Sequence, residues 1–146
     1  MNPIVPEADE VLPGLYIGTC TSCGVVNNRR AEFGPFRSIC VLEGPHSIAC
    51  IHHRILSQTA LGVDRDQLLS AAARIAEWWD QRRICDERLL IHCGAGIERS
   101  PLVVATWLAE FCGLTLDEAY RWLKARRPIV EDRRVWLPRD WTPPWL

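Results

Sequence analysis

The sequence predicts an α/β fold: a central, mostly parallel sheet of four to five strands flanked by helices on both faces. Short apolar runs of strand character alternate with segments whose apolar residues recur at helical spacing. The run 88–92 has an entirely apolar centre, residues 89–91, as expected for a central parallel strand covered on both faces. A loop with two glycines follows that run and leads into a helix, which places the loop at the carboxyl end of the central strand.

The N-terminal part of the chain is expected to supply the other strands. Three segments carry this pattern: 10–18, a strand or hairpin with its turn at Pro13-Gly14, then 38–42 and 51–56. Residues 19–36 are mixed and leave room for one short helix before Gly34.

Three segments are predicted to be helices. They are residues 66–83, the segment from Ser100 to Gly113, and the segment from Thr115 to about Arg127. Asp66 suits the cap of the first helix, and Asp64 with Gln67 is the alternative. Thr115 with Glu118 forms a second capping box, and Pro128 ends the last helix.

The loop after the central strand is the best candidate for a functional site. With Cys93 and Arg99 six positions apart, the residues between them can close into a ring of inward-pointing backbone N–H groups at a helix start. Such a ring binds anions, and the planar guanidinium of Arg99 can hold two oxygens of a phosphate. The residues predicted to bind phosphate are Gly94, Ala95, Gly96, Ile97, Glu98 and Arg99.

Three further residues of this stretch have chemical roles. The positive potential around Cys93 should favour its thiolate, which is a nucleophile for phosphoryl transfer. Ser100 can donate a hydrogen bond to that sulfur when the sulfur departs from phosphorus in the second half of the reaction. His92 is expected to orient the loop and not to donate a proton. The glycines Gly94 and Gly96 would permit the unusual backbone angles of a tight loop.

The pattern His-Cys-x-x-Gly-x-x-Arg-Ser, at residues 92–100, resembles the signature of cysteine-dependent protein phosphatases, most closely the small dual-specificity type. Segments 11–18, 116–120 and 126–128 are similar to flanking segments of that family. The resemblance implies a phosphocysteine intermediate on Cys93 and a phosphorylated protein as substrate. The short chain favours a shallow cleft open to phosphotyrosine, phosphoserine and phosphothreonine. The resemblance implies no cofactor and no metal.

Two other functions stay open. A phosphoinositide phosphatase is the second choice, because relatives that act on inositol lipids tend to carry lysines in the loop and this loop has none. A catalytically silent phosphate-binding module would also keep the loop. The presence of Cys93, Arg99 and Ser100 together disfavours it.

The general acid is expected on a loop well before the cysteine, as in relatives, with Asp64 preferred to Asp66 and with Glu131 or Asp132 next. Two positions depart from the family pattern. Glu98 lies where relatives have a small residue, and we expect its side chain to face outward. Residues 130–132 lack the Pro-Asn that relatives often show.

The composition bounds the rest of the prediction. A chain of 146 residues, 48% hydrophobic, suits a single catalytic domain over residues 1–146. A net charge of −1 indicates no general attraction to nucleic acid or to membrane surfaces. We find no secretory signal and no run of roughly 20 apolar residues. A reactive cysteine must stay reduced, so we expect a cytoplasmic protein. Nothing in the sequence indicates an oligomeric state.

The remaining cysteines, histidines and tryptophans are expected to have structural roles. Cys20 and Cys23 could be half of a zinc site, but no second pair lies at suitable spacing. Cys40 is expected in a buried strand, and the residues His46, His52 and His53 on the surface or on an edge strand. The C-terminal tail, with Trp136, Trp141 and Trp145, is expected to pack on the domain without forming a helix, and partner binding is the alternative.

Overall fold

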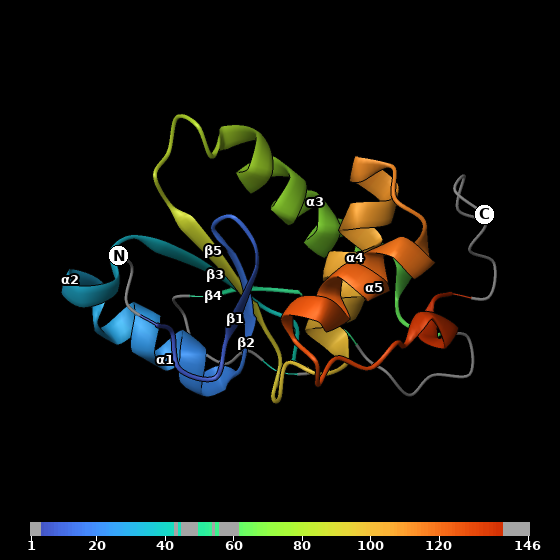
Figure 1. Ribbon diagram of the computed structural model, residues 1–146, viewed down its shortest axis with the longest axis horizontal. Coiled ribbons are helices and arrows are strands. Elements are labelled where there is room, and N and C mark those ends of the chain that lie inside the picture. Colours follow the sequence, from blue (N-terminus) through green and yellow to red (C-terminus); the bar gives the residue numbers. More distant parts are fainter. Residues whose placement is uncertain (1–3, 43, 45–49, 54, 56–61, 139–146) are drawn as a thin grey trace.

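The computed structural model describes residues 4–42, 44, 50–53, 55 and 62–138. A five-stranded sheet in the order β1-β2-β5-β3-β4 is flanked by helices on both faces (Figure 1). The strands are β1 (Asp9–Leu12), β2 (Leu15–Gly18), β3 (Phe36–Cys40), β4 (Cys50–His52) and β5 (Arg88–His92). The helices are α1 (Cys20–Asn28), α2 (Arg30–Phe33), α3 (Arg65–Gln81), α4 (Arg99–Cys112), α5 (Leu116–Arg126) and the 3₁₀ turn η1 (Arg134–Trp136). The predicted fold class is confirmed.

Strand β5 is the middle strand of the sheet. It pairs in parallel with β2 on one side and β3 on the other, and only the hairpin of β1 and β2 is antiparallel among the described strands. Its side chains alternate between the faces: Leu89 and Ile91 enter one core, and Leu90 enters the other. Because apolar residues are needed on both faces, residues 89–91 are all hydrophobic.

The larger core lies between the sheet and helices α3, α4 and α5. Helix α4 is buried over ten consecutive residues, from Ser100 to Ala109, which explains its nearly uniform apolar sequence. Gly113 ends it in the left-handed conformation, and Thr115 with Glu118 begins α5 as a capping box, both as predicted. No described helix has the length and apolar character needed to cross a bilayer.

The smaller core covers the opposite face, where α1 and α2 pack on Tyr16, Phe36 and Leu90. Only one short helix was predicted in this region. Helix α1 contains Gly24 and two valines, so its own helical propensity is weak. Its capping box uses Thr19 with Ser22 instead of an acidic partner, and contacts with the sheet hold it.

Three local predictions need correction. The cap of α3 is Asp64, whose carboxylate accepts the Gln67 N–H at 2.9 Å, and Asp66 lies in the first turn. Strands β3 and β4 each begin earlier than predicted, at Phe36 and Cys50. The tail is not free of helix, because η1 makes one 3₁₀ turn and leaves Trp136 half-buried against the larger core. Residues 141 and 145, and His46, lie outside the described residues.

Candidate active site

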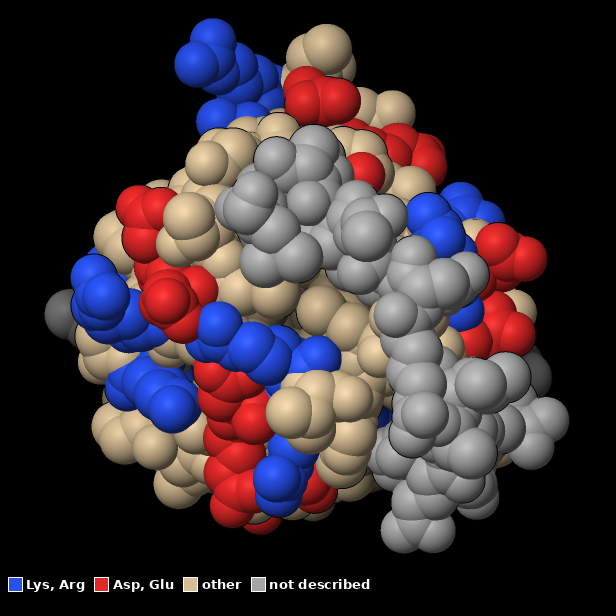
Figure 2. All heavy atoms as spheres, turned by 90° about the vertical axis from the view of Figure 1, so that its right-hand side faces the viewer, with Lys and Arg blue, Asp and Glu red and all other residues tan. Residues whose placement is uncertain are grey.

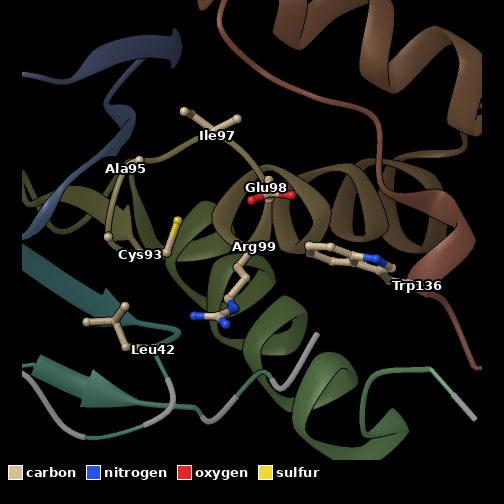
Figure 3. Close-up of a pocket in the computed structure, with 8 residues that line it drawn as sticks. Leu42, Cys93, Ala95, Ile97, Glu98, Arg99 and Trp136 are labelled. Carbon is tan, nitrogen blue, oxygen red and sulfur yellow. The ribbon is translucent and has the colours of Figure 1, made fainter. Parts of the chain in front are cut away.

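Residues 93–98 connect β5 to α4 at the carboxyl edge of the sheet. Gly18 of β2 and Cys40 of β3 lie in register with His92, so three parallel strands end beside the loop. A pocket of about 200 Å³ opens over the loop (Figure 3). Its lining residues are Leu42, Cys93, Gly94, Ala95, Ile97, Glu98, Arg99 and Trp136. The structure thus brings most of the predicted site residues to one cavity.

The Cys93 sulfur lies in this pocket beside the hydroxyl of Ser100. The Sγ and Oγ atoms are 3.0 Å apart, and both residues are buried. The sulfur therefore has a hydroxyl neighbour on the helix side and an opening on the pocket side. This pair has the geometry that the sequence predicted.

Hydrogen bonds to three of its carbonyl oxygens hold the loop from the outside. Arg127 donates from Nη2 to the oxygen of Ala95 at 3.1 Å and from Nε to the oxygen of Gly96 at 2.9 Å. The N–H of Glu131 donates to the oxygen of Ile97 at 2.9 Å. In a trans peptide the C=O and the following N–H point in opposite directions. The N–H groups of residues 96–98 therefore point away from Arg127 and Glu131, as a ring of anion donors requires.

The sequence placed Arg127 in a family-like segment and at the end of the last helix, and did not predict its position under the loop. It is 4% exposed, and its guanidinium also bonds Asp9 at 2.8 Å and the Glu7 carbonyl at 3.3 Å. One buried side chain thus joins the N-terminal segment to the loop. An arginine has enough donors in a fixed fork for all four partners, whereas a lysine does not.

We expect Arg127→Lys to lower kcat for an aryl phosphate by about 10-fold or more, because two carbonyls that shape the loop lose their donors. The free energy of unfolding should fall by about 2–3 kcal/mol. Asp9→Asn is the matched control: it removes the charge of the half-exposed partner and leaves both loop contacts in place. Steady-state kinetics and urea unfolding measure both effects, and equal losses in the two variants would contradict a role in shaping the loop.

The two loop glycines differ in their need for glycine. Gly96 has a φ of +67°, and a Cβ there would lie 2.7 Å from Nη2 of Arg127 and 2.8 Å from the Gly18 oxygen. Gly94 has no positive φ and no neighbour that a Cβ would meet within 4 Å. The expectation of unusual backbone angles is confirmed for Gly96 and wrong for Gly94.

Gly96→Ala should therefore lower the free energy of unfolding by about 2 kcal/mol or more, through left-handed backbone strain and displacement of Arg127. Gly94→Ala is the control and should change stability by less than about 0.5 kcal/mol. Denaturant unfolding of the two purified variants measures the difference. Equal stabilities would mean that the loop relaxes around a new methyl group.

Glu98 forms an ion pair that links the loop to the segment before η1. Its Oε2 accepts from Nε of Arg133 at 2.8 Å, and Arg133 also pairs with Glu131. The hydrogen bond that Arg133 donates to Glu98 is the main reason that the pKa of Arg133 lies above its ordinary value. Figure 2 shows acidic and basic side chains interleaved on the part of one face where the side chains are coloured. The charge of Glu98 is thus balanced by a local partner.

None of the four candidates for the general acid is among the described residues that line the pocket. Two of the candidates lie beside lining residues: Val63, directly before Asp64, donates its N–H to the Trp136 oxygen at 2.8 Å, and the Glu131 N–H donates to the Ile97 oxygen at 2.9 Å. Burial raises the pKa of Asp132, but bonds from Arg134 outweigh it and leave that pKa below the ordinary value. A carboxyl with a lowered pKa is a poor proton donor, which disfavours Asp132.

Leu42 and Trp136 were not predicted to belong to the site. Both are half-buried and lie on the rim of the pocket, one after β3 and the other in η1 (Figure 3). They come from segments 94 positions apart, so no local pattern marks them as neighbours. The only signal was the expectation that the tail packs on the domain.

A group of cysteines lies behind the loop, on the side of α1. The Cys20 thiol faces the Cys93 carbonyl at 3.8 Å, and burial raises its pKa. The Cys23 and Cys50 sulfurs are 3.0 Å apart, and the Cys50 sulfur is 3.5 Å from Nε2 of His92. The contact with Cys23, together with burial, raises the pKa of the Cys50 thiol. Cys40 is buried in β3, and His52 lies on the edge strand β4, both as predicted.

Comparisons with known proteins agree on one family. The family model "Dual specificity phosphatase, catalytic domain" matches residues 64–136. Mouse dual specificity protein phosphatase 14 is 49% identical over 41 residues, which cover 28% of this chain and 21% of that protein. Mouse dual specificity protein phosphatase 2 is 26% identical over 141 residues, which cover 88% of this chain and 42% of that protein. The chain thus spans less than half the length of these relatives.

A solved structure of another protein has a similar fold. The crystal structure of human DUSP28 superposes with a TM-score of 0.65 at 21% identity, over 92% of this chain and 90% of that one. At this identity the likeness concerns the fold.

Proposed function

The chain belongs to the dual specificity phosphatase family, and on this basis we propose that it hydrolyses phosphate esters of protein side chains through a phosphocysteine intermediate on Cys93. The observation that carries the proposal is the Cys93 sulfur, 3.0 Å from Ser100 Oγ in a pocket that Arg99 also lines. A nucleophile, a cation and a ring of backbone donors meet there. Phosphoryl transfer needs little more from a protein than such positioning and charge stabilisation.

In the first step the Cys93 thiolate attacks phosphorus, an S–P bond forms, and the P–O bond to the substrate breaks. The N–H groups of residues 96–98 and the Arg99 guanidinium hold the nonbridging oxygens, which carry the developing charge. The leaving oxygen takes a proton from the general acid. In the second step water attacks phosphorus and gives a proton back to the deprotonated general acid, the S–P bond breaks, and inorganic phosphate leaves. Ser100 donates to the departing sulfur and so makes the thiolate a better leaving group.

The pocket suits an aryl phosphate. Leu42, Ile97 and Trp136 give it an apolar rim, against which the ring of a phosphotyrosine can pack. At about 200 Å³ the cavity is small, and such a cleft also leaves phosphoserine and phosphothreonine within reach of the sulfur. An inositol phosphate headgroup has several negative charges, and the loop between Cys93 and Arg99 contains no lysine to bind them. We therefore place protein substrates before lipid ones.

Activity of this kind requires a reduced cysteine. We propose a reducing compartment such as the cytoplasm as the place of action, because an oxidised Cys93 could not attack phosphorus. Phosphorylated proteins are the proposed partners.

The proposal is tested by phosphate release from purified, reduced protein with three substrates: a phosphotyrosine peptide, a phosphothreonine peptide and a phosphoinositide. We expect the highest kcat/KM for the phosphotyrosine peptide. Faster turnover of the phosphoinositide would show that the preferred substrate is a lipid and not a protein. If all three bind and none is hydrolysed, the chain is a silent phosphate-binding module.

We propose Asp64 as the general acid and expect Asp64→Asn to lower kcat on a tyrosyl phosphate by at least about 10-fold. Asparagine caps a helix as well as aspartate does, so the α3 cap survives and only the proton donor is lost. The fall of kcat at high pH should disappear, and a substrate with a very good leaving group should be much less affected. Asp66→Asn is the matched control. If it shows these effects and Asp64→Asn does not, Asp66 is the acid. If neither does, Glu131 is the next residue to replace.

A further inference from the structure

Three potential metal ligands meet behind the loop, outside the proposed catalytic machinery. They are Cys23 of α1, Cys50 at the start of β4 and His92 at the end of β5. One ligand atom from each lies within 4.8 Å of the other two. Cys23 and His92 are buried, and Cys50 is half-buried. Helix α1, the edge strand β4 and the central strand β5 thus each contribute one ligand.

The distances fit a tetrahedral ion of zinc size. Zinc binds sulfur at about 2.3 Å and nitrogen at about 2.0–2.1 Å, so two sulfur ligands lie about 3.8 Å apart and a sulfur and a nitrogen about 3.5 Å apart. The Cys50 sulfur lies 3.5 Å from Nε2 of His92. The two sulfurs, 3.0 Å apart, would have to separate by about 0.8 Å. A side-chain rotation at the half-buried Cys50 can provide this.

The surroundings of Cys23 suit a thiolate ligand. Asn27, one helical turn further along α1, donates from Nδ2 to the Cys23 sulfur at 3.2 Å. The same nitrogen lies 3.0 Å from Ser38 Oγ on β3 and 2.9 Å from the Cys23 carbonyl. Asn27 is therefore held beside the sulfur, and its two Nδ2 hydrogens are shared among these three acceptors. Hydrogen bonds of this kind orient ligands and stabilise their negative charge at metal sites.

We propose that Cys23, Cys50 and His92 bind one zinc ion, with a water molecule in the fourth position on the half-exposed side of Cys50. Two thiolates and one imidazole are the ligand types that zinc prefers. The bound ion joins α1, β4 and β5 and holds the imidazole of the residue directly before Cys93. The site is separate from the proposed reaction, which uses the pocket on the other side of Cys93.

Cobalt(II) is a spectroscopic probe for such a site, because cobalt–thiolate bonds absorb in the near ultraviolet. The full chain, reduced with a phosphine and stripped of metal with a chelator, is titrated with cobalt(II) without oxygen, and zinc is then added. We expect thiolate-to-cobalt absorption that saturates at one equivalent and disappears when zinc displaces cobalt. Cys50→Ser should weaken binding by at least about 100-fold, since it removes a direct ligand.

Two controls separate this site from other thiols. Cys85→Ser, at an exposed position, should bind cobalt like the wild type. Cys93→Ser should also keep the absorption and its stoichiometry. Absorption that is lost in Cys93→Ser and kept in Cys50→Ser would assign the metal to the catalytic thiol and overturn the proposal. A wild-type protein that gives no absorption would overturn it too.

A second measurement does not depend on the folding of any variant. X-ray absorption at the zinc edge of the loaded wild-type protein counts ligands by type. Two sulfurs and one imidazole support the proposal, and a single sulfur or none contradicts it.

Discussion

Cys93→Ser is expected to reduce the hydrolysis of an aryl phosphate to below about one thousandth of the wild-type rate, because a serine hydroxyl at neutral pH is a far weaker nucleophile than a thiolate. The variant should still bind inorganic phosphate. The donors of residues 96–98 and the Arg99 side chain are unchanged, and the hydroxyl occupies about the same space as the thiol. Initial rates with an aryl phosphate and competition by phosphate measure the two properties separately.

Cys112→Ser is the matched control for this variant. Cys112 is exposed at the end of α4, far along the helix from the loop. The Cys112→Ser variant should keep the wild-type rate. A residual rate of a tenth or more in Cys93→Ser would show that another residue attacks phosphorus.

Arg99→Lys should lower kcat by about 10²–10³-fold, the loss seen when a charge-stabilising donor is removed from a transition state. Arg99 lines the pocket beside Cys93, and its guanidinium can hold two phosphoryl oxygens at once. A lysine keeps the positive charge but offers a single point of contact in place of a planar fork. The loss should appear mainly in kcat, since the bond strengthens as charge develops on the oxygens.

Arg126→Lys serves as the comparison for Arg99→Lys. Arg126 lies at the end of α5, with its guanidinium over the Trp122 ring and outside the pocket. The same chemical change there should leave kcat within about 2-fold of wild type. If Arg99→Lys matched it, the proposed role of Arg99 in holding the phosphoryl group would be wrong.

Local patterns predicted the elements that carry the loop. The apolar residues 89–91, the glycine at position 96 and the apolar helix before Gly113 are short-range signals. They correspond, in that order, to β5, the loop and α4. The capping box at Thr115 marked the start of α5 in the same way. These features depend on backbone geometry and on burial of a whole segment, which a few neighbouring residues are enough to indicate.

Elements of weak propensity were predicted less well. The sequence predicts one short helix where the structure has α1 and the short α2, and β4 spans only three residues on the edge of the sheet. Their conformation depends on packing against the sheet, which a single sequence window does not contain. The α3 cap was predicted at Asp66 with Asp64 as the alternative, because two acids two positions apart both fit the pattern, and the structure places Asp64 there.

By itself, the sequence determined the fold class and the stretch from Cys93 to Ser100, because an apolar strand, a glycine in the left-handed region and a helix start are encoded by adjacent residues. Only the tertiary structure decided what surrounds that stretch. Arg127 reaches two loop carbonyls from 31 and 32 positions away, and Cys23, Cys50 and His92 meet across separations of 27 and 42 positions. Such contacts follow from the order of strands in the sheet and from the faces on which helices pack, so spacing along the chain does not reveal them.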